Sequence, residues 1–422
     1  MNMNKCFLIL TQKTNIMKKI IVLLLAFSII KSTNAQWFSQ TSNTVNYLTS
    51  VFFLNADTGF VVGASGTILK TTNGGSVWSV QPSVTSYNLR SICFANQDVG
   101  YMVGQYGRIF KTSDGGDNWL SQTIDTIYDF WSVYFISADT GFIAGKFGNY
   151  GRVMKTVDGG NNWIPFSASY GETTIFYSVH FINSNIGLAA GYYYNPYSFY
   201  PLILKTTDGG STWNPKYPIG DILTSVYLVN ADTGYAVGWD NTIIKTINGG
   251  NGWTSQYSST NVSLYSIYFP ASDTGYVVGG DGTILKTTNG GSNWNTQNSG
   301  STNGLTSVFF IDTDTGFAVG SSGTILKTTN GGIITNVDNY EFERSDVQIY
   351  PNPVNDIIFI KNPGNQKATV EILNSVGRVV YNTHLSNTEN SKELDISALA
   401  NGVYFMKVQY EKSFIIQKLI KR

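Results

Sequence analysis

The chain has 422 residues, of which only 13% are charged, and its formal net charge is zero. This balance offers no electrostatic footprint for nucleic acid or an anionic membrane surface. The 43 Gly, 26 Tyr and 24 Phe favour an extracellular protein made of short β-strands. Of the two cysteines, Cys6 and Cys93, the first lies in a leader segment, so a disulfide-stapled scaffold is excluded and packing must stabilise the fold.

Residues 1–35 are predicted to be a secretory signal peptide. A basic start at Met17, the favoured initiation site, precedes an apolar run over residues 20–30. Cleavage is expected between Ala35 and Gln36. The run is shorter than the roughly 20 residues that span a membrane, so the mature chain is expected to be soluble.

Residues 36–332 contain seven copies of a unit of about forty residues, each with four short β-rich runs. This period predicts an all-β, seven-bladed β-propeller. A residue present in every copy is expected to build a blade, so the differences between copies carry the information about function. The copies are marked by an Asp/Asn-x-Gly turn at Asp57, Asp98, Asp139, Asn185, Asp232, Asp273 and Asp314.

A recurring tryptophan marks the fourth strand in six of the copies, three residues after a Gly-Gly pair. The seventh pair, ending at Gly332, has no such tryptophan. Trp37 stands thirteen residues before Ser50, the same spacing that separates Trp78 from Ser91. We therefore expect the segment of Trp37 to supply the outer strand of the last blade, which would close the ring and leave no unpaired edge.

The turn before each tryptophan resembles the Asp-box of bacterial neuraminidase repeats, with Thr206–Trp213 matching every position. A short Asp or Asn side chain can accept backbone N–H bonds in such a turn. Because Asn replaces Asp in four copies, the role is expected to be structural, neither catalytic nor metal-binding. The predicted capping residues are Asn73, Asp114, Asp158, Asp208, Asn248, Asn289 and Asn330.

The repeat as a whole is similar to the propeller family of photosystem II stability and assembly factors, over residues 36–332. The resemblance implies the fold, and it implies one possible role as an assembly chaperone for a membrane protein complex.

Two adjacent copies, the third and fourth, are longer between their second and third strands. The added residues are rich in Tyr, which suits stacking on sugar rings or anchoring a protein partner. The alternative is that they only cover the ends of the blades. The candidate ligand-binding residues are Arg108, Tyr150, Arg152, Tyr170, Glu172, Tyr192, Tyr193, Tyr194, Tyr197 and Tyr200.

Catalysis is not expected, although a polysaccharide-active hydrolase remains an alternative. A sialidase needs a cluster of arginines, and a glycosidase needs two opposed carboxylates. Between residues 36 and 332, Glu172 is the sole Glu and His180 the sole His, which is predicted to be a packed strand residue. No cofactor, metal site or nucleic-acid partner is expected, and the propeller is expected to be a monomer. A hydrolase would draw on Asp125, Asp129, Glu172, Asp221 and Asp240.

After a linker at residues 333–346, residues 347–422 are predicted to be a small β-sandwich. They resemble the type A sorting domain of the type IX secretion system, which implies contact with that machinery, passage through the periplasm and removal during export. A carbohydrate-binding sandwich is the alternative. The residues that carry the resemblance are Tyr350, Pro351, Asn352, Pro353, Gly377, Arg378, Gly402 and Lys418.

Overall fold

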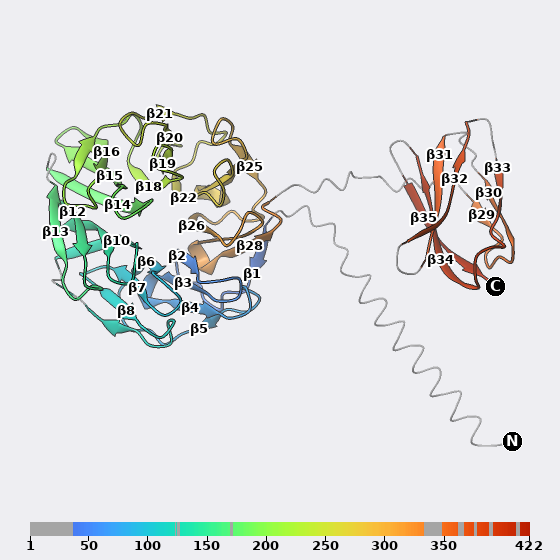
Figure 1. Ribbon diagram of the computed structural model, residues 1–422, viewed down its shortest axis with the longest axis horizontal. Helices are drawn as coiled ribbons and strands as arrows, with labels where there is room; N and C mark the ends of the chain where they lie inside the picture. The colour runs from blue at the N-terminus through green and yellow to red at the C-terminus, as the bar shows by residue number, and fades with distance from the viewer. Residues whose placement is uncertain are drawn as a thin grey trace, which may run out of the picture. The chain divides into compact units, whose positions relative to one another are not determined.

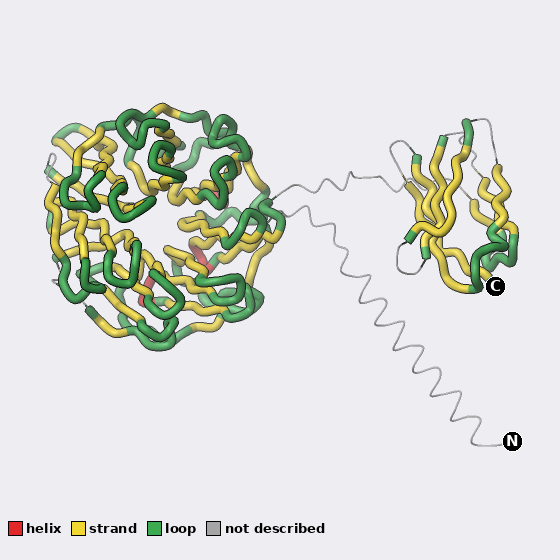
Figure 2. Tube along the Cα trace, in the orientation of Figure 1, coloured by secondary structure: helices red, strands yellow, loops and turns green. Residues whose placement is uncertain are grey.

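The computed structural model describes residues 37–122, 124, 127–168, 172–332, 348–361, 367–374, 378–387, 391–410 and 414–422. Within these ranges, the helical elements are three single 3-10 turns and the rest is strand, turn and loop (Figure 2). The all-β class expected from the sequence is confirmed. The chain divides into two compact units at residues 334 and 335. The predicted cleavage site (Ala35, Gln36) and the linker at residues 333–346 lie outside the described residues.

The first unit is a circle of four-stranded antiparallel sheets, each of which is one blade (Figure 1). Six blades take four consecutive strands each. The first blade contains β2 (Leu48–Phe53), β3 (Gly59–Gly63), β4 (Ile68–Thr71) and β5 (Ser79–Val80). The second contains β6 (Leu89–Phe94), β7 (Gly100–Gly104), β8 (Ile109–Thr112) and β9 (Leu120–Ser121). The third contains β10 (Tyr128–Phe135), β11 (Gly141–Phe147), β12 (Tyr150–Thr156) and β13 (Ile164–Ala168). The fourth blade contains β14 (Thr173–Phe181), β15 (Gly187–Asn195), β16 (Ser198–Thr206) and β17 (Asn214–Lys216). The fifth contains β18 (Leu223–Leu228), β19 (Gly234–Gly238), β20 (Ile243–Thr246) and β21 (Thr254–Ser255). The sixth contains β22 (Leu264–Tyr268), β23 (Gly275–Gly279), β24 (Ile284–Thr287) and β25 (Asn295–Gln297). The 3-10 turns are η1 (Ala64–Gly66), η2 (Gly280–Gly282) and η3 (Ser321–Gly323).

The last sheet combines both ends of the repeat region. Its strands are β26 (Leu305–Phe310), β27 (Thr315–Gly320), β28 (Ile325–Thr329) and β1 (Phe38–Gln40). Strand β1 pairs antiparallel with β28, with Phe38 opposite Lys327. Trp37, only 1% exposed, packs edge-on against Tyr276 and Phe310 at centroid distances of 6.3 and 5.8 Å. The outermost strand of this blade therefore comes from the segment that the spacing of Trp37 indicates.

The innermost strand of each blade lines the central axis and has a characteristic irregularity. In β2, a β-bulge falls between Leu48 and Ser50. Leu48 is buried, and the next two residues, Thr49 and Ser50, are both half-buried. A bulge interrupts the alternation of side chains between the two faces of a sheet. Two consecutive side chains of each innermost strand can therefore face the axis.

Close packing between rings and backbone explains two glycines of the repeat. A Cβ on Gly59 would lie 2.6 Å from the ring of Phe53, so only glycine fits under that ring. Gly75 has a φ of +81°, a conformation that L side chains rarely adopt, and a Cβ there would lie 2.5 Å from Phe317 of the neighbouring blade. The turns of the repeat thus allow the blades to approach each other closely.

The Asp-box turns form compact hydrogen-bonded caps. The Oδ1 atom of Asp208 accepts bonds from the hydroxyl of Thr206 (2.8 Å) and the backbone N–H of Thr212 (2.9 Å). Hydrogen bonds from Thr212, side chain and backbone, and from Thr206 lower the pKa of Asp208 to about 2. Asn73 accepts the equivalent bonds from Thr71 (3.0 Å) and Val77 (2.9 Å). Asn therefore fills the same position without a charge.

The second unit is a two-sheet sandwich. One sheet contains β29 (Gln348–Tyr350), β30 (Ile357–Lys361) and β33 (Ser391–Asp395), and the other contains β32 (Val379–Leu385), β31 (Ala368–Leu373), β34 (Gly402–Gln409) and β35 (Phe414–Lys421). Ile358, Val370, Leu394 and Met406 are among its fully buried core residues.

Candidate functional site

A ring of serines joins all neighbouring blades around the central channel. In each case, the hydroxyl oxygen accepts a hydrogen bond from the backbone N–H of the following blade's innermost strand. Between Ser132 and Val179 the distance is 3.2 Å, and between Ser178 and Val226 it is also 3.2 Å. The seven serines are Ser50, Ser91, Ser132, Ser178, Ser225, Ser266 and Ser307.

The residue before each serine also faces the channel, and here the blades differ. Three blades have a threonine whose hydroxyl lies near two carbonyl oxygens, one in its own blade and one in the next. Thr49, for example, lies 3.1 Å from the oxygen of Val62 and 2.8 Å from that of Leu89. The seven residues are Thr49, Arg90, Trp131, Tyr177, Thr224, Tyr265 and Thr306.

These side chains and the serine ring surround an open cavity of about 490 Å³, which we call the channel mouth. Further lining residues come from the connections between blades and from the turns between second and third strands: Tyr47, Ala64, Asn88 and Trp239. Its volume falls in the range typical of small-ligand pockets. None of its lining residues is Asp or Glu.

Arg90 is the cation of the channel mouth. Its guanidinium carbon lies 4.0 Å from the ring centroid of Trp131, and Trp131 in turn meets Tyr177 edge-on at 5.4 Å. The Nη1 atom is buried and has no hydrogen-bond partner in the described part of the chain. Desolvation lowers the pKa of Arg90, while the charge of Asp129 raises it. The guanidinium is thus held against an aromatic surface with part of its donor capacity unused.

A second ring of side chains lies three residues further along the innermost strands, and none of its members lines the channel mouth. It consists of Phe52, Cys93, Tyr134, His180, Tyr227, Tyr268 and Phe309. His180 contacts Tyr227 at 4.4 Å, and its Nδ1 accepts the backbone N–H of Leu228 at 3.2 Å. Burial raises the pKa of Cys93 to about 12. The channel mouth therefore opens at the end where second and third strands connect, which we call the hairpin face.

The inserted residues of the third and fourth blades are extended strands, where the sequence suggested loops. Strands β15 and β16 pair from Gly187 and Thr206 outward to Asn195 and Ser198. Along this hairpin, Tyr193 stacks on Tyr200 at 5.2 Å. The side chains of Tyr193 and Tyr200 and their neighbours on β15 and β16 therefore form an aromatic surface on the hairpin face, which we call the tyrosine ledge.

The structure places the remaining candidates along the same face. Arg152 lies over the rings of Phe147 (5.4 Å) and Tyr150 (5.7 Å) in the third blade. Arg108 lies over Tyr87 at 4.9 Å in the second. Tyr194 contacts Phe199 at 5.0 Å and Tyr197 is 92% exposed.

Of the acidic candidates, Asp129 belongs to the third blade and Glu172 to the fourth, while Asp221 and Asp240 lie in neighbouring connections of the fifth. Glu172 is exposed, and its backbone N–H donates to the oxygen of Tyr194. Asp129 accepts the backbone N–H of Tyr106 at 3.3 Å. Tyr170 and Asp125 lie outside the described residues. Among the residues that the structure describes, no group of three or more His, Cys, Asp or Glu could hold a metal ion.

The ledge and the channel mouth meet at Tyr177 and Tyr192. Their ring centroids are 5.9 Å apart, with an angle of 33° between the ring planes. Burial is the largest cause of the raised pKa of both phenols. The aromatic surface predicted on the fourth blade thus continues into a pocket that the sequence analysis did not identify.

The sorting motif forms a clamp on the last strand of the second unit. The Asn352 side chain donates to the backbone oxygen of Lys418 (2.6 Å) and accepts the N–H of Ile420 (3.0 Å). Val354 adds a backbone bond to Ile420. Both Pro351 and Pro353 follow cis peptide bonds.

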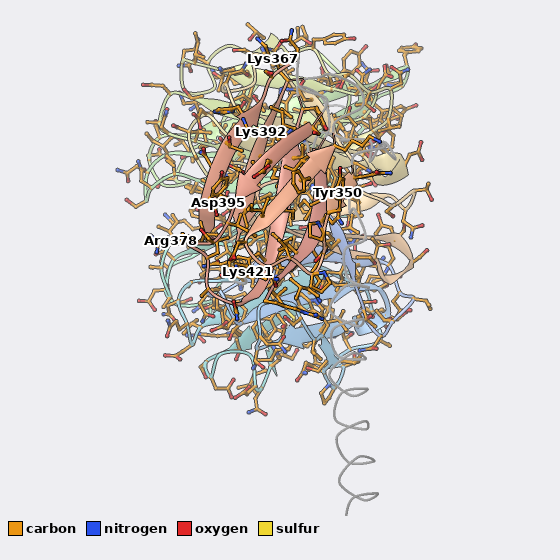
Figure 3. The ribbon with its side chains drawn as sticks, turned by 90° about the vertical axis from the view of Figure 1, so that its right-hand side faces the viewer. Tyr350, Lys367, Arg378, Lys392, Asp395 and Lys421 are labelled. Carbon is orange, nitrogen blue, oxygen red and sulfur yellow. The ribbon has the colours of Figure 1, made fainter. Side chains whose placement is uncertain are left out.

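The ends of this sandwich differ in the basic residues they carry. Arg378 and Lys421 lie toward one end of the sandwich and Lys367 toward the other (Figure 3). Gly402 begins β34 and pairs with Lys421. Lys421 forms an ion pair with Asp356 at 2.9 Å and its side chain is only 4% exposed. Gly377 lies outside the described residues.

Together, the circle of sheets with Asp-box turns and the clamped sandwich define a repeat propeller with a C-terminal sorting domain. Residues 348–422 match the Secretion system C-terminal sorting domain. Four overlapping segments match Photosynthesis system II assembly factor YCF48, and together they span more than half of the chain, so the protein belongs to this family. Both resemblances are confirmed. The four segments are residues 29–128, 84–170, 215–298 and 254–329.

Solved propeller structures resemble the first unit. One is YCF48 bound to a D1 peptide, with 18% identity and a TM-score of 0.57, over 70% of this chain and 97% of that one. YCF48 from Cyanidioschyzon merolae has 17% identity and a TM-score of 0.58, over 69% and 98%. The WD40 propeller domain of Doa1 has 14% identity and a TM-score of 0.54, over 69% and 96%. At these identities the likeness shows the fold alone. Among curated proteins, none matches the chain. In its described residues, no helix is long and apolar enough to cross a membrane.

Proposed function

We propose that this protein is a non-catalytic binding propeller, exported by type IX secretion, that takes a glycan or a protein partner on its hairpin face. The observation that carries the proposal is the contact between Tyr177 and Tyr192. It makes the tyrosine ledge of the fourth blade continuous with the channel mouth. Aromatic side chains provide large contact areas at a low cost in conformational entropy.

The export route follows from the two ends of the chain. The predicted signal peptide, residues 1–35, directs the chain to the periplasm. The sorting domain at residues 348–422 then addresses it to the type IX machinery. Removal of that domain leaves the propeller secreted or at the cell surface.

The positions of the carboxylates support a binding role over a hydrolase. A glycosidase needs two carboxyl groups that face each other across the scissile bond. Asp221 accepts the backbone N–H of Ile222 at 2.6 Å, and Asp129 accepts that of Tyr106. Neither is part of the channel mouth, whose lining includes no acidic residue.

Assembly of a membrane protein complex is a second candidate. It is supported by membership in the YCF48 family and by the similar structure of YCF48 bound to a D1 peptide. In that case, a segment of a partner protein occupies the same face.

The test is binding by the full-length mature chain to a glycan array and to cell-envelope proteins. A triple variant, Tyr193→Ser with Tyr197→Ser and Tyr200→Ser, is expected to lose binding. Tyr257→Ser, at an exposed tyrosine of a different blade, is the matched control and is expected to bind normally. Equal binding by the triple variant and the wild type would contradict the proposed face. Turnover of a bound glycan would contradict the non-catalytic role.

A further inference from the structure

The residues that directly precede the seven ring serines in the sequence fall into two groups. Thr49, Thr224 and Thr306 each place a hydroxyl within 2.6–2.8 Å of a carbonyl oxygen in the next blade. A threonine at this position therefore helps to join blades. Four blades instead have the large side chains Arg90, Trp131, Tyr177 and Tyr265. None of these can reproduce the short hydroxyl contact, so joining the blades does not explain their presence.

Arg90 supplies a positive charge that no ion pair neutralises within the described residues. Among the same residues its Nη1 has no acceptor, although it is buried. The charge of Asp129 also acts on Arg90, but the Oδ1 atom of Asp129 accepts the backbone N–H of Tyr106 at 3.3 Å and forms no ion pair with the guanidinium. A buried donor without a partner is costly, and an anionic oxygen is its strongest acceptor.

The serine ring adds donors below the guanidinium. Each of the seven hydroxyls uses its oxygen to accept a backbone N–H from the next blade. Within the described residues, none of these hydroxyls donates its own proton to another protein atom. A serine hydroxyl can accept and donate at once. The wall of the channel mouth therefore presents a circle of small donors to whatever enters.

We propose that the channel mouth binds a uronic acid residue of an acidic glycan, with the sugar carboxylate on the Arg90 guanidinium. This inference rests on the proposed function and specifies its ligand. The sugar hydroxyls meet the serine ring, and its apolar face packs against the aromatic sector of Trp131 and Tyr177. The remainder of the glycan follows the tyrosine ledge of the fourth blade.

The dimensions favour a sugar over a protein surface. A cavity of about 490 Å³ holds one or two sugar residues, whereas a protein partner needs a broad contact area. A neutral sugar would leave the Arg90 donor without an anionic partner. A peptide with a free C-terminal carboxylate could reach the guanidinium, but it would not use a circle of hydroxyl donors as fully.

The experiment uses the full-length mature protein and oligomers of galacturonate, glucuronate and mannuronate. Each oligomer is paired with its carboxyl-reduced counterpart, and binding is measured by calorimetry. We expect at least one acidic oligomer to bind and Arg90→Gln to weaken it by roughly tenfold or more, since the lost interaction is a charged hydrogen bond. The carboxyl-reduced oligomer is expected to bind both proteins equally weakly.

Two further variants separate charge from folding. Arg90→Lys keeps the charge and should restore part of the affinity. Lys216→Gln removes a charge from an outer strand of the fourth blade and should bind as the wild type does. The midpoint of unfolding for each variant, followed by Trp fluorescence, reports whether its fold is intact.

The outcomes distinguish this inference from the proposed function. If a glycan binds equally well with Arg90→Gln or after carboxyl reduction, the uronate assignment is wrong and the binding function stands. If none of the acidic oligomers binds, the assignment is also wrong. If a peptide binds through Arg90 and its C-terminal amide does not, the ligand is a peptide instead. Only the absence of any glycan or envelope partner contradicts the proposed function itself.

Discussion

The hydroxyl of Ser307 accepts a hydrogen bond from the backbone N–H of Val51, 3.3 Å away, across 256 residues of sequence. The same bond joins Ser132 to Val179 in consecutive blades at 3.2 Å. The last blade is therefore joined to the first at the channel by the geometry that joins every other pair. At the periphery, β1 adds a second connection by pairing with β28.

The first prediction concerns this serine ring. Ser307→Ala leaves the N–H of Val51 without its acceptor and is expected to reduce the free energy of unfolding by about 1–3 kcal/mol. Ser132→Ala should cost the same, because the bond is equivalent. All nine tryptophans lie between residues 37 and 294, so Trp fluorescence during urea unfolding follows the propeller alone. Ser76→Ala, at an exposed turn, should have no measurable effect.

The second prediction concerns Trp37, which is buried like its counterpart Trp78 in the first blade. Trp78 packs edge-on against Phe53 and Phe317 as Trp37 packs against Tyr276 and Phe310. Replacing either by Ala should cost about 3–5 kcal/mol of propeller stability in urea unfolding. A much smaller loss for Trp37→Ala than for Trp78→Ala would mean that the N-terminal segment is not an integral part of its blade.

Repetition explains why the fold could be predicted from the sequence. Each copy has a similar pattern of apolar and polar residues and an Asp or Asn at the same turn position. A strand that is ambiguous in one copy can therefore be assigned from its counterparts in the other copies. The role of Trp37 followed from one spacing, since a missing strand at residue 332 has to be supplied from elsewhere. The hydrogen bonds from Asn352 to the backbone of β35 could not be predicted in this way, because the two residues that meet are 66 positions apart in the sequence.

The channel mouth was missed although its signal was present. Differences in length between the second and third strands of the copies indicate the tyrosine ledge. The variation from Thr49 to Arg90 and Trp131 lies inside the innermost strand, at the position directly before the recurring serine, where no copy has an inserted residue. Simple alternation puts Thr49 and Ser50 on opposite faces, and only the bulge between Leu48 and Ser50 allows both to face the channel. A bulge has no reliable signature in a single sequence.

The third prediction concerns the Asp-box carboxylates. Hydrogen bonds from Asn118 lower the pKa of Asp114 to about 2, those from Thr212 lower that of Asp208 to about 2, and those from Asn162 lower that of Asp158. Because these values lie below the usual one near 4, the stabilisation is complete above pH 4 and is lost as the pH falls toward 2. A triple Asp→Asn variant at Asp114, Asp158 and Asp208 should keep its melting temperature at pH 7 and lose less of it between pH 4 and 2. An unchanged acid slope would show that these carboxylates contribute nothing.

The fourth prediction concerns His180. Burial lowers its pKa to about 4, below the value of 6.5 that it has when unfolded. Between these values only the unfolded state takes up the proton, so the propeller should lose stability, on the order of 3 kcal/mol, as the pH falls from 6.5 to 4. Proton NMR of the full chain, with the His180 signal assigned by its loss in His180→Gln, should show that residue titrating near 4. Titration of His180 near 6.5 would contradict its assigned packing.

The fifth prediction concerns the clamp of the sorting domain. Asn352 holds the backbone of β35 at Lys418 and Ile420, and the backbone of Val354 adds bonds to Ile420 and Arg422. Asn352→Ala removes both side-chain bonds, so the amides of β35 should exchange with deuterium several-fold faster while β31 stays protected. Asn382→Ala, at an exposed position on β32, is the matched control. If the last strand must be held in register for recognition by the secretion machinery, Asn352→Ala should also retain the protein inside the cell, whereas Asn382→Ala should be exported. Normal export of Asn352→Ala with a loosened β35 would show that the machinery does not require this strand to be fixed.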